Sequence, residues 1–454
     1  YTGAMRTGAV PLNINYRFIE KELNYVLTLN DVKYVLVQDD FIDRMKVAVE
    51  GTKVKEVIVI DSGLGKDIPK DWHWYEDLIK EYPKSKPEFP WLTSTWKEPF
   101  LIQNTTGTTG FPKGGLFAPE GIINLIPQAI RMISPDIHII RSFPIAEMVQ
   151  RSGVVRSPIA RRLSTTLLPV VESVLKGPVG NIILDPSGVD SLGTLVDKVL
   201  PMVLKMKVES SKWLIYLLYT LLGGRLRVLS LAPLIGGVGI TAFGFAFGTG
   251  GTLILPTSRR LDPKENWELI EKKKPNLIIV VGDGVCKPMN DFAKPGEYDT
   301  SSVLLIITGA TYATPRIRGA FLDRFPNSIF LDAYSATEIW LGQFALYTQQ
   351  NKYAPARWKK PDHIDILDEN GQPVKPGEIG EIVYHGRLGV VGYYKQPSDT
   401  KGEAKFKVTE DGKVICYTED LAMLDEDGYF TCLGRGPQCI NTGGWKVWPN
   451  EIEG

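Results

Sequence analysis

The sequence predicts an α/β protein made of parallel βαβ units, with a β-rich segment toward its C-terminus. Helical and strand patterns alternate between residues 18 and 60 and again between residues 262 and 331. From residue 376 onward, apolar and polar residues alternate with a period of two, which is typical of antiparallel strands. A chain of 454 residues is too long for one compact core, so we expect two or three subdomains.

The first alternation predicts helices over residues 18–29 and 41–49 and strands over residues 33–37 and 56–60. Short strands separated by helices form parallel sheets, because a parallel connection needs a crossover. Residues 83–99 contain four prolines and are predicted to form a linker.

The second alternation begins with a helix start signal at Asp262, which is followed by Pro263 and by Glu265. Strand patterns cover residues 277–281, 304–308 and 328–331, and Thr314-Pro315 opens a further helix. Each strand pattern ends in a glycine-rich or polar segment. Because ligands bind beyond the carboxyl ends of such strands, these segments predict a ligand crevice.

The β-rich segment shows strand patterns at residues 380–384 and 413–417 and over residues 421–433. Asp427-Gly428 is a hairpin turn signal within the last of these.

Composition excludes several classes of function. Lys and Arg total 52 and Asp and Glu total 52, so no overall charge indicates a nucleic-acid partner. The four cysteines form no CxxC pair and the four histidines are scattered, which argues against a metal cluster. No apolar run reaches the length of a membrane span, and we expect a cytoplasmic protein.

Residues 103–114 read QNTTGTTGFPKG and follow a short apolar strand. Glycines let backbone N–H groups approach an anion, threonines add hydroxyl donors, and Lys113 supplies a point charge suited to phosphate. The segment fits neither a Walker loop nor a dinucleotide fingerprint, because Lys113 precedes two glycines and the glycine spacing differs. A surface loop without a ligand is the alternative.

The segment resembles the phosphate loop of the adenylate-forming enzymes, a superfamily that includes acyl-CoA synthetases, luciferases and peptide-synthetase adenylation domains. The resemblance implies that this loop binds the nucleotide and that Lys113 is also catalytic. The implied loop residues are Thr105, Thr106, Gly107, Thr108, Thr109, Gly110 and Lys113.

Residues 334–338, YSATE, resemble a second motif of this superfamily. The resemblance implies that Thr337 hydrogen-bonds the α-phosphate, that Glu338 holds Mg²⁺, and that Tyr334 stacks on adenine. Asp332 is included among the nucleotide-binding residues. Mg²⁺ prefers one or two carboxylates together with phosphate oxygens, which agrees with this role for Glu338. An ordinary exposed carboxylate is the alternative.

Three further segments resemble nucleotide contacts of the superfamily. Gly309, Ala310 and Thr311 match the segment that lines adenine, with a simple tight turn as the alternative. Asp420 matches the aspartate that accepts both ribose hydroxyls, and the alternative is a solvated hairpin edge. A carboxylate suits a vicinal diol because it offers only acceptors. Arg435 matches a residue that contacts ribose or phosphate.

The resemblance implies an N-terminal adenylation domain over residues 1–436, made of parallel βαβ subdomains and a β-rich subdomain. Residues 437–454 would form the hinge and the start of a small C-terminal domain, whose catalytic lysine we expect beyond Gly454. The chain departs from the family pattern at Ser335 and Glu419, where glycine is usual, and at the hinge residue Pro437. Gly236 stands where relatives often carry a histidine in the acyl pocket.

Residues 131–227 align poorly with the superfamily. Within residues 198–227, six basic residues accompany one acidic residue and a short apolar run, residues 213–222. A buried helix, a wall of the acyl tunnel and a patch on a membrane surface remain open as interpretations.

The implied activity is that of an AMP-forming acid-thiol ligase. An ATP-dependent acyl-CoA synthetase would activate a fatty or other hydrophobic acid as acyl-AMP and transfer it to CoA, using Mg²⁺. Two alternatives remain: an enzyme that hands acyl-AMP to another acceptor, and a nucleotide- or acyl-binding homologue without turnover. A homodimer and peripheral membrane contact also remain open, whereas no nucleic-acid partner is expected.

Overall fold

The structure, a computed structural model, divides by its internal contacts into two units. One comprises residues 1–120 with 390–408, and the other comprises residues 121–389 with 409–454. The predicted domain boundary at residue 436 lies outside the described residues. The structure describes residues 2–82, 99–104, 113–117, 226–248, 250–311, 313–336, 339, 342–386, 390–395, 406–409, 414–435, 440–442 and 445–447.

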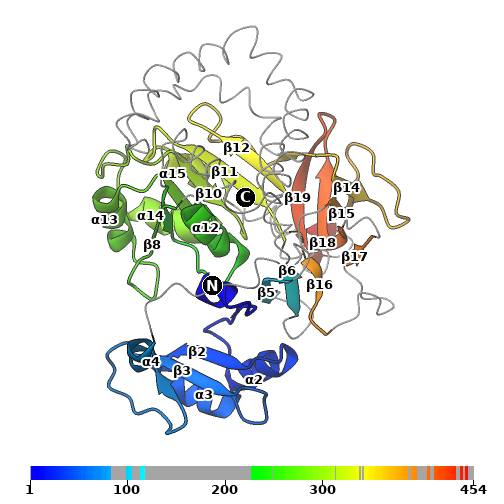
Figure 1. The fold of residues 1–454 in the computed structure, drawn as a ribbon. Helices are drawn as coiled ribbons and strands as arrows, with labels where there is room; N and C mark the ends of the chain where they lie inside the picture. Colours follow the sequence, from blue (N-terminus) through cyan, green and yellow to red (C-terminus); the bar gives the residue numbers. More distant parts are fainter. Residues whose placement is uncertain are drawn as a thin grey trace, which may run out of the picture. The chain divides into compact units, whose positions relative to one another are not determined.

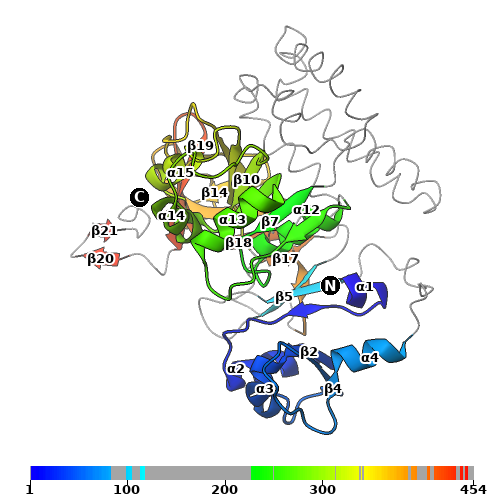
Figure 2. The same cartoon turned by 90° about the vertical axis from the view of Figure 1, so that its left-hand side faces the viewer.

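The first unit contains a parallel three-stranded sheet, which confirms the predicted βαβ pattern. Its core joins apolar residues of two helices to inward-facing valines of the strands, including Leu27, Val37 and Val59. In both Figure 1 and Figure 2 these two helices, α2 and α3, lie on the same face of the sheet. The elements are α2 (Glu20–Leu29), β2 (Tyr34–Gln38), η1 (Asp39–Phe41), α3 (Ile42–Ala48), β3 (Glu56–Ile60), β4 (His73–Trp74) and α4 (Tyr75–Glu81).

A second sheet of this unit has the strand order β1-β5-β6-β16. β5 and β6 flank the predicted phosphate loop as an antiparallel pair, and β16 joins them from about 270 residues later in the chain, which makes the pairing non-local. The strands of this sheet are β1 (Leu12–Asn13), β5 (Leu101–Asn104), β6 (Gly114–Phe117) and β16 (Val390–Tyr393). The unit also contains α1 (Thr2–Arg6) and β17 (Phe406–Val408), which lie outside this sheet.

The second unit contains a six-stranded sheet of order β12-β11-β10-β9-β7-β8, in which only β12 runs antiparallel to its neighbour. Strands β9 and β10 are almost fully apolar and buried, as expected of a sheet covered on both faces. Its elements are β7 (Arg227–Ser230), α12 (Gly237–Gly248), β8 (Thr252–Ile254), α13 (Pro263–Lys273), β9 (Leu277–Val280), α14 (Gly282–Phe292), β10 (Leu305–Thr308), α15 (Pro315–Leu322), β11 (Ile329–Tyr334) and β12 (Gln343–Tyr347).

The predicted helix start at Asp262 is confirmed, since its carboxylate accepts from the backbone N–H of Lys264 and Glu265. Glu265 does not complete a capping box. Its carboxylate instead accepts from the backbone N–H groups of Thr257 and Ser258 in the preceding loop. The prediction for β11 was too short, because pairing with β12 continues the strand through Tyr334.

The β-rich segment forms an antiparallel sheet in the order β13-β19-β18-β15-β14. The predicted turn at Asp427-Gly428 is confirmed, and Gly428 has a φ of 75°. The predicted break between residues 417 and 421 is wrong, because one strand with a bulge runs through both segments. The strands of this sheet are β13 (Trp358–Lys359), β14 (Ile364–Leu367), β15 (Ile379–Gly386), β18 (Val414–Leu424) and β19 (Tyr429–Arg435). Strands β20 (Ile440–Thr442) and β21 (Trp445–Val447) form a separate antiparallel pair.

No helix of the described residues is long and apolar enough to cross a membrane. Of the basic segment at residues 198–227, with its three open interpretations, only residues 226 and 227 belong to the described part of the chain.

Candidate functional site

Lys113 directly precedes Gly114, the N-terminal residue of β6 and the first that pairs with β5. Its side chain is half-buried, and its Nζ lies 5.6 Å from the ring centroid of Tyr393 on β16, within the range of a cation–π contact. The rest of the predicted loop lies outside the described residues, namely Thr105, Thr106, Gly107, Thr108, Thr109 and Gly110.

Gly114, next to Lys113, could carry a side chain only if neighbouring side chains moved. A Cβ built there would lie 2.3 Å from Oδ1 of Asn30, at the C-terminal end of α2. The carbonyl of Gly114 accepts the backbone N–H of Tyr394 at 2.9 Å. The base of the phosphate loop is therefore packed between α2 and the strand β16.

The adenine-type segment begins directly after β10. Gly309 is buried, and a Cβ there would approach Val238 of α12 at 3.1 Å. Ala310 is exposed and has a φ of 68°, a left-handed conformation that glycine adopts more easily. Thr311 is also exposed. Backbone of this kind is concentrated at functional sites, which is compatible with the predicted adenine-lining role.

Asp332 lies on β11 opposite Thr308 of β10 and is only 2% exposed. Its Oδ2 has no hydrogen-bond partner. Burial raises the pKa of this carboxyl group to about 7, against the attraction of Arg318, and Asp283 adds a smaller increase. The group therefore holds a proton through much of the acidic range.

Arg318 of α15 is fully buried, and its positive charge partly offsets the rise in the pKa of Asp332. Its guanidinium donates to the carbonyls of Ala313, Lys352 and Ala354 and stacks 3.4 Å from the ring centroid of Tyr347. The sequence analysis did not single out Arg318, because nothing local in the helix distinguishes it from an exposed arginine.

Tyr334 and Asp420 are in direct contact. The Tyr334 hydroxyl donates to Oδ2 of Asp420 at 2.9 Å and also lies 3.3 Å from the Thr418 hydroxyl. Burial, and next the charge of Asp420, raises the pKa of Tyr334 well above its ordinary value, so the hydroxyl remains a donor. The ring is 6% exposed and packs edge-on against Phe430.

A bulge in β18 brings Asp420 to this position. Val383 pairs with Tyr417 and Glu381 with Leu421, so three residues of β18 stand opposite Ile382 alone. The Thr418 hydroxyl donates to the Ile382 carbonyl at 2.8 Å. It also accepts the backbone N–H of Asp420 at 3.2 Å. Thr418 thus fixes the bulge, a role that the sequence analysis missed.

Glu419 occupies the middle of the bulge with a φ of 62°. This left-handed backbone explains why glycine is usual here in the motif that the segment resembles. The backbone N–H of Glu419 donates to the Glu381 carboxylate at 2.9 Å, so the bulge forms despite the unfavourable residue. Bulges of this kind often redirect a side chain next to an active site.

Two catalytic candidates, Thr337 and Glu338, lie outside the described residues. Arg435 pairs with Asp420 across β18 and β19, so the two predicted ribose contacts share one register position. Among the described residues, no group of three or more His, Cys, Asp or Glu residues is arranged to hold a metal ion.

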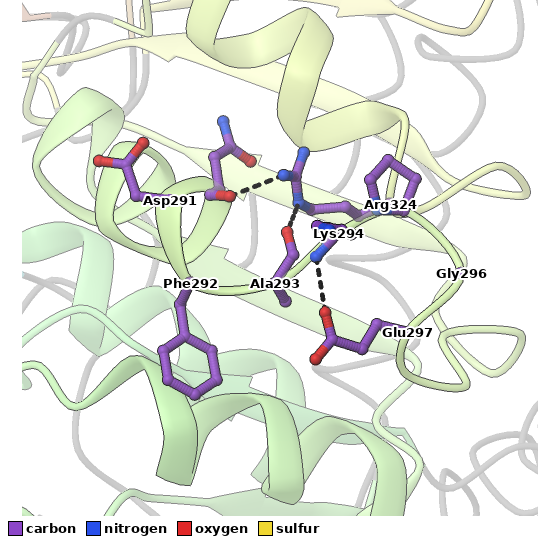
Figure 3. A pocket seen from close by; sticks show the side chains of 9 residues that line it. Asp291, Phe292, Ala293, Lys294, Gly296, Glu297 and Arg324 are labelled. Atoms are coloured by element: carbon purple, nitrogen blue, oxygen red, sulfur yellow. Dashed lines mark hydrogen bonds between the residues drawn. The ribbon is translucent and has the colours of Figure 1, made fainter.

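A surface pocket of about 590 Å³ lies at the C-terminal end of α14. Figure 3 shows that Arg324 points toward the end of this helix, where it donates to the carbonyls of Asn290 and Ala293. A third donation reaches the carbonyl of Ala320. The guanidinium thus caps the helix end. Because the pocket lies away from the carboxyl ends of the strands, we do not assign it to the nucleotide.

The second unit thus contains a mostly parallel sheet with polar segments at the carboxyl ends of β10 and β11, the edge at which α/β sheets bind their ligands. The chain belongs to the family of AMP-binding enzymes, whose profile matches residues 1–140 and 205–394.

Curated relatives extend this result along the chain. The chain is 25% identical over 456 residues to a medium/long-chain-fatty-acid and 3-oxocholest-4-en-26-oate CoA ligase of Mycobacterium tuberculosis, with 99% of the chain and 68% of the relative covered. It is 24% identical to the 3-oxocholest-4-en-26-oate CoA ligase of Rhodococcus rhodochrous, with 98% of the chain and 68% of the relative covered.

Solved structures show the same fold. The anthranilate CoA ligase AuaEII in complex with anthranoyl-AMP gives a TM-score of 0.64 at 16% identity, covering 99% of the chain and 67% of that structure. ATP-bound MatB from Rhodopseudomonas palustris gives 0.62 at 17% identity, covering 99% of the chain and 68% of that structure. The expected adenylate-forming fold is confirmed.

Proposed function

We propose that this chain is an ATP-dependent acyl-CoA synthetase that acts on a fatty or other hydrophobic carboxylic acid. One observation carries the proposal. This chain belongs to the AMP-binding family, and 99% of its length aligns with a curated ligase that joins such acids to CoA.

The proposed reaction has two steps. A carboxylate oxygen of the acid attacks the α-phosphorus of ATP, which forms acyl-AMP and releases pyrophosphate. The thiol sulfur of CoA then attacks the acyl carbon, which forms the thioester and releases AMP. The first step joins two anions, so the protein must neutralise charge and hold the reactants in position.

Lys113 and the N–H groups of the phosphate loop would supply that neutralisation, together with the hydroxyl of Thr337. Glu338 would hold Mg²⁺, which prefers carboxylate and phosphate oxygens and would reduce the charge on the phosphates. No side-chain nucleophile is required. The buried Cys286 is poorly suited to act as a nucleophile, because burial raises the pKa of its thiol.

The nucleoside would be held by the second unit. Asp420 would accept the ribose hydroxyls with its carboxylate fixed by Tyr334, and Arg435 lies at the same register position. Gly309, Ala310 and Thr311 would line the adenine with their backbone, and Asp332 lies on the neighbouring strand. Adenine stacking on Tyr334 remains a prediction, and it would use a ring that is largely buried.

A panel of carboxylic acids, each incubated with ATP, Mg²⁺ and CoA, tests the function. We expect release of AMP that depends on the acid, with hydrophobic acids preferred and CoA consumed in equal amount. Acid-dependent exchange of pyrophosphate into ATP without CoA consumption would indicate a different acceptor. If neither exchange nor ATP binding is found for any acid, the proposal is wrong.

A further inference from the structure

Asp31 caps the C-terminal end of α2 in a conformation that usually requires glycine. Its φ is 48°. Its N–H donates to the Thr28 carbonyl at 3.3 Å, and the next N–H, of Val32, donates to the Leu27 carbonyl at 3.0 Å. These two bonds form a Schellman motif, in which the left-handed position is most often glycine. An aspartate at this position therefore needs an explanation beyond the helix end.

The Asp31 carboxylate collects three donors from distant parts of the first unit. Tyr394 donates its hydroxyl to Oδ2 at 3.0 Å, and Nζ of Lys395 lies 2.5 Å from the same oxygen. Nζ of Lys53 lies 2.9 Å from Oδ1. The Asp31 side chain is 16% exposed, whereas those of Lys395 and Lys53 are 47% and 69% exposed. The lysines, Lys395 first, hold the pKa of Asp31 well below its usual range.

Two of these donors directly follow β16, the strand that borders the phosphate loop. Lys395 also adopts a left-handed backbone, with a φ of 57°, which is unfavourable for lysine and only moderately so for Asp31. The ion pair with Asp31 helps to hold Lys395 in this conformation.

Residues of β16 and directly after it make two contacts at or next to Lys113. The N–H of Tyr394 donates to the carbonyl of Gly114 at 2.9 Å, which fixes the backbone next to Lys113. The buried ring of Tyr393 lies 5.6 Å below the Lys113 ammonium group. Asn30, which precedes Asp31, packs against Gly114 from the side of α2.

We infer that Asp31 is a positioning residue for Lys113: it ties β16 to the end of α2 and so fixes where the lysine of the phosphate loop lies. This inference rests on the proposed role of Lys113 in binding ATP. Neither the comparisons nor the phosphate-loop motif assigns a role to Asp31.

Asp31→Gly is the most direct test, because glycine suits the helix cap and removes only the carboxylate. We expect ATP affinity, measured by calorimetry, to fall by about ten- to a hundredfold, since one charged contact between Lys113 and a phosphate contributes an amount of this size. In a Lys113→Ala background the same change should have no further effect. Equal losses in both backgrounds, or no loss in the single variant, would overturn the inference.

A second measurement needs no nucleotide. The rate at which acetic anhydride acetylates Lys113, followed by mass spectrometry, should rise in Asp31→Gly because the lysine is less confined. If acetylation rises while Lys113→Ala leaves ATP binding unchanged, the positioning holds and the proposed phosphate role of Lys113 is wrong. If Lys113→Ala weakens ATP binding and Asp31→Gly changes neither quantity, only the inference fails.

Matched variants separate this contact from general stability. Lys395→Ala should reproduce the loss of ATP affinity seen in Asp31→Gly, because Lys395 directly follows β16. Lys53→Ala should have little effect on ATP affinity, because Lys53 lies between α3 and β3 and does not connect Asp31 to β16. Asp43→Asn is the control, since Asp43 forms an exposed ion pair with Lys66 at 2.9 Å in the same unit. Loss of ATP affinity in the control, or full affinity in Lys395→Ala, would contradict the inference.

Discussion

The Tyr334 hydroxyl donates a 2.9 Å hydrogen bond to the carboxylate of Asp420, across 86 residues of sequence. Tyr334 ends β11 of the parallel sheet, and Asp420 lies in a bulge of the β-rich sheet. The bond therefore joins the six-stranded sheet to the β-rich sheet at the proposed ribose site. It gives Tyr334 a role as a donor that sequence comparison alone would not assign.

Tyr334→Phe should weaken ATP binding, because it removes one donor from the Asp420 carboxylate and leaves that group less well fixed. A hydrogen bond to a charged group contributes about 1.5–3 kcal/mol, which corresponds to roughly ten- to a hundredfold in affinity. Calorimetric titration of the variant and of the unaltered protein with ATP measures this change in affinity. Tyr347→Phe is the control, since this buried tyrosine donates to the Pro355 carbonyl instead.

Asp420→Asn should weaken ATP binding far more than binding of the acid, since the proposed contact is to ribose only. The amide keeps the shape of the side chain but loses the charge and one acceptor. Affinities for ATP, for deoxy-ATP lacking ribose hydroxyls, and for the acid should be compared. An ATP affinity equal to that of the unaltered protein would remove Asp420 from the site.

Glu419→Gly should stabilise the protein, because Glu419 adopts a left-handed backbone with a φ of 62°. Relief of this strain should raise the free energy of unfolding by about 1 kcal/mol. The hydrogen bond to Glu381 is donated by the backbone and is retained. Glu426→Gly, at an exposed turn position that is not left-handed, should not stabilise, and chemical denaturation compares the two.

Asp332→Asn should change how stability depends on pH. Burial raises the pKa of Asp332 from 3.8 to about 7, so between these values the native state binds a proton that the unfolded state has lost. Stability from this group is therefore present at low pH and is lost as pH rises through that window, at up to about 1.4 kcal/mol per pH unit.

The asparagine variant carries no such proton. Its stability relative to the unaltered protein should rise from about pH 4 to pH 7, as measured by urea unfolding at several pH values. The groups that face this carboxyl are Arg318 on α15 and Asp283 and Cys286 on α14. A difference in stability that does not change with pH would mean that Asp332 is ionised in the native state.

Glu338→Ala should abolish most adenylation without unfolding the protein, because the proposed role of Glu338 is to hold Mg²⁺ at the phosphates. Removal of one such electrostatic element lowers the rate by about 10²–10³. Pyrophosphate exchange across a range of Mg²⁺ concentrations measures this effect. A rate near that of the unaltered protein at saturating Mg²⁺ would remove Glu338 from the metal site.

The sequence by itself determined the types of element and most of their order. Strand β3 falls at its predicted bounds, the helix cap at Asp262 forms as expected, and the turn at Asp427-Gly428 is in place. These features depend on residues a few positions apart, so the local pattern suffices to predict them. The phosphate-loop motif is likewise local, and it led to the family that the comparisons support.

The tertiary structure alone decided which side chains meet. Tyr394 reaches Asp31 across 363 residues, Tyr334 reaches Asp420, and Arg318 donates to carbonyls beyond β12. It also decided that Asp332 is buried and that Thr418 fixes the bulge of β18. Such contacts depend on how strands from distant parts of the chain pair and pack, and no periodicity within one segment encodes that pairing.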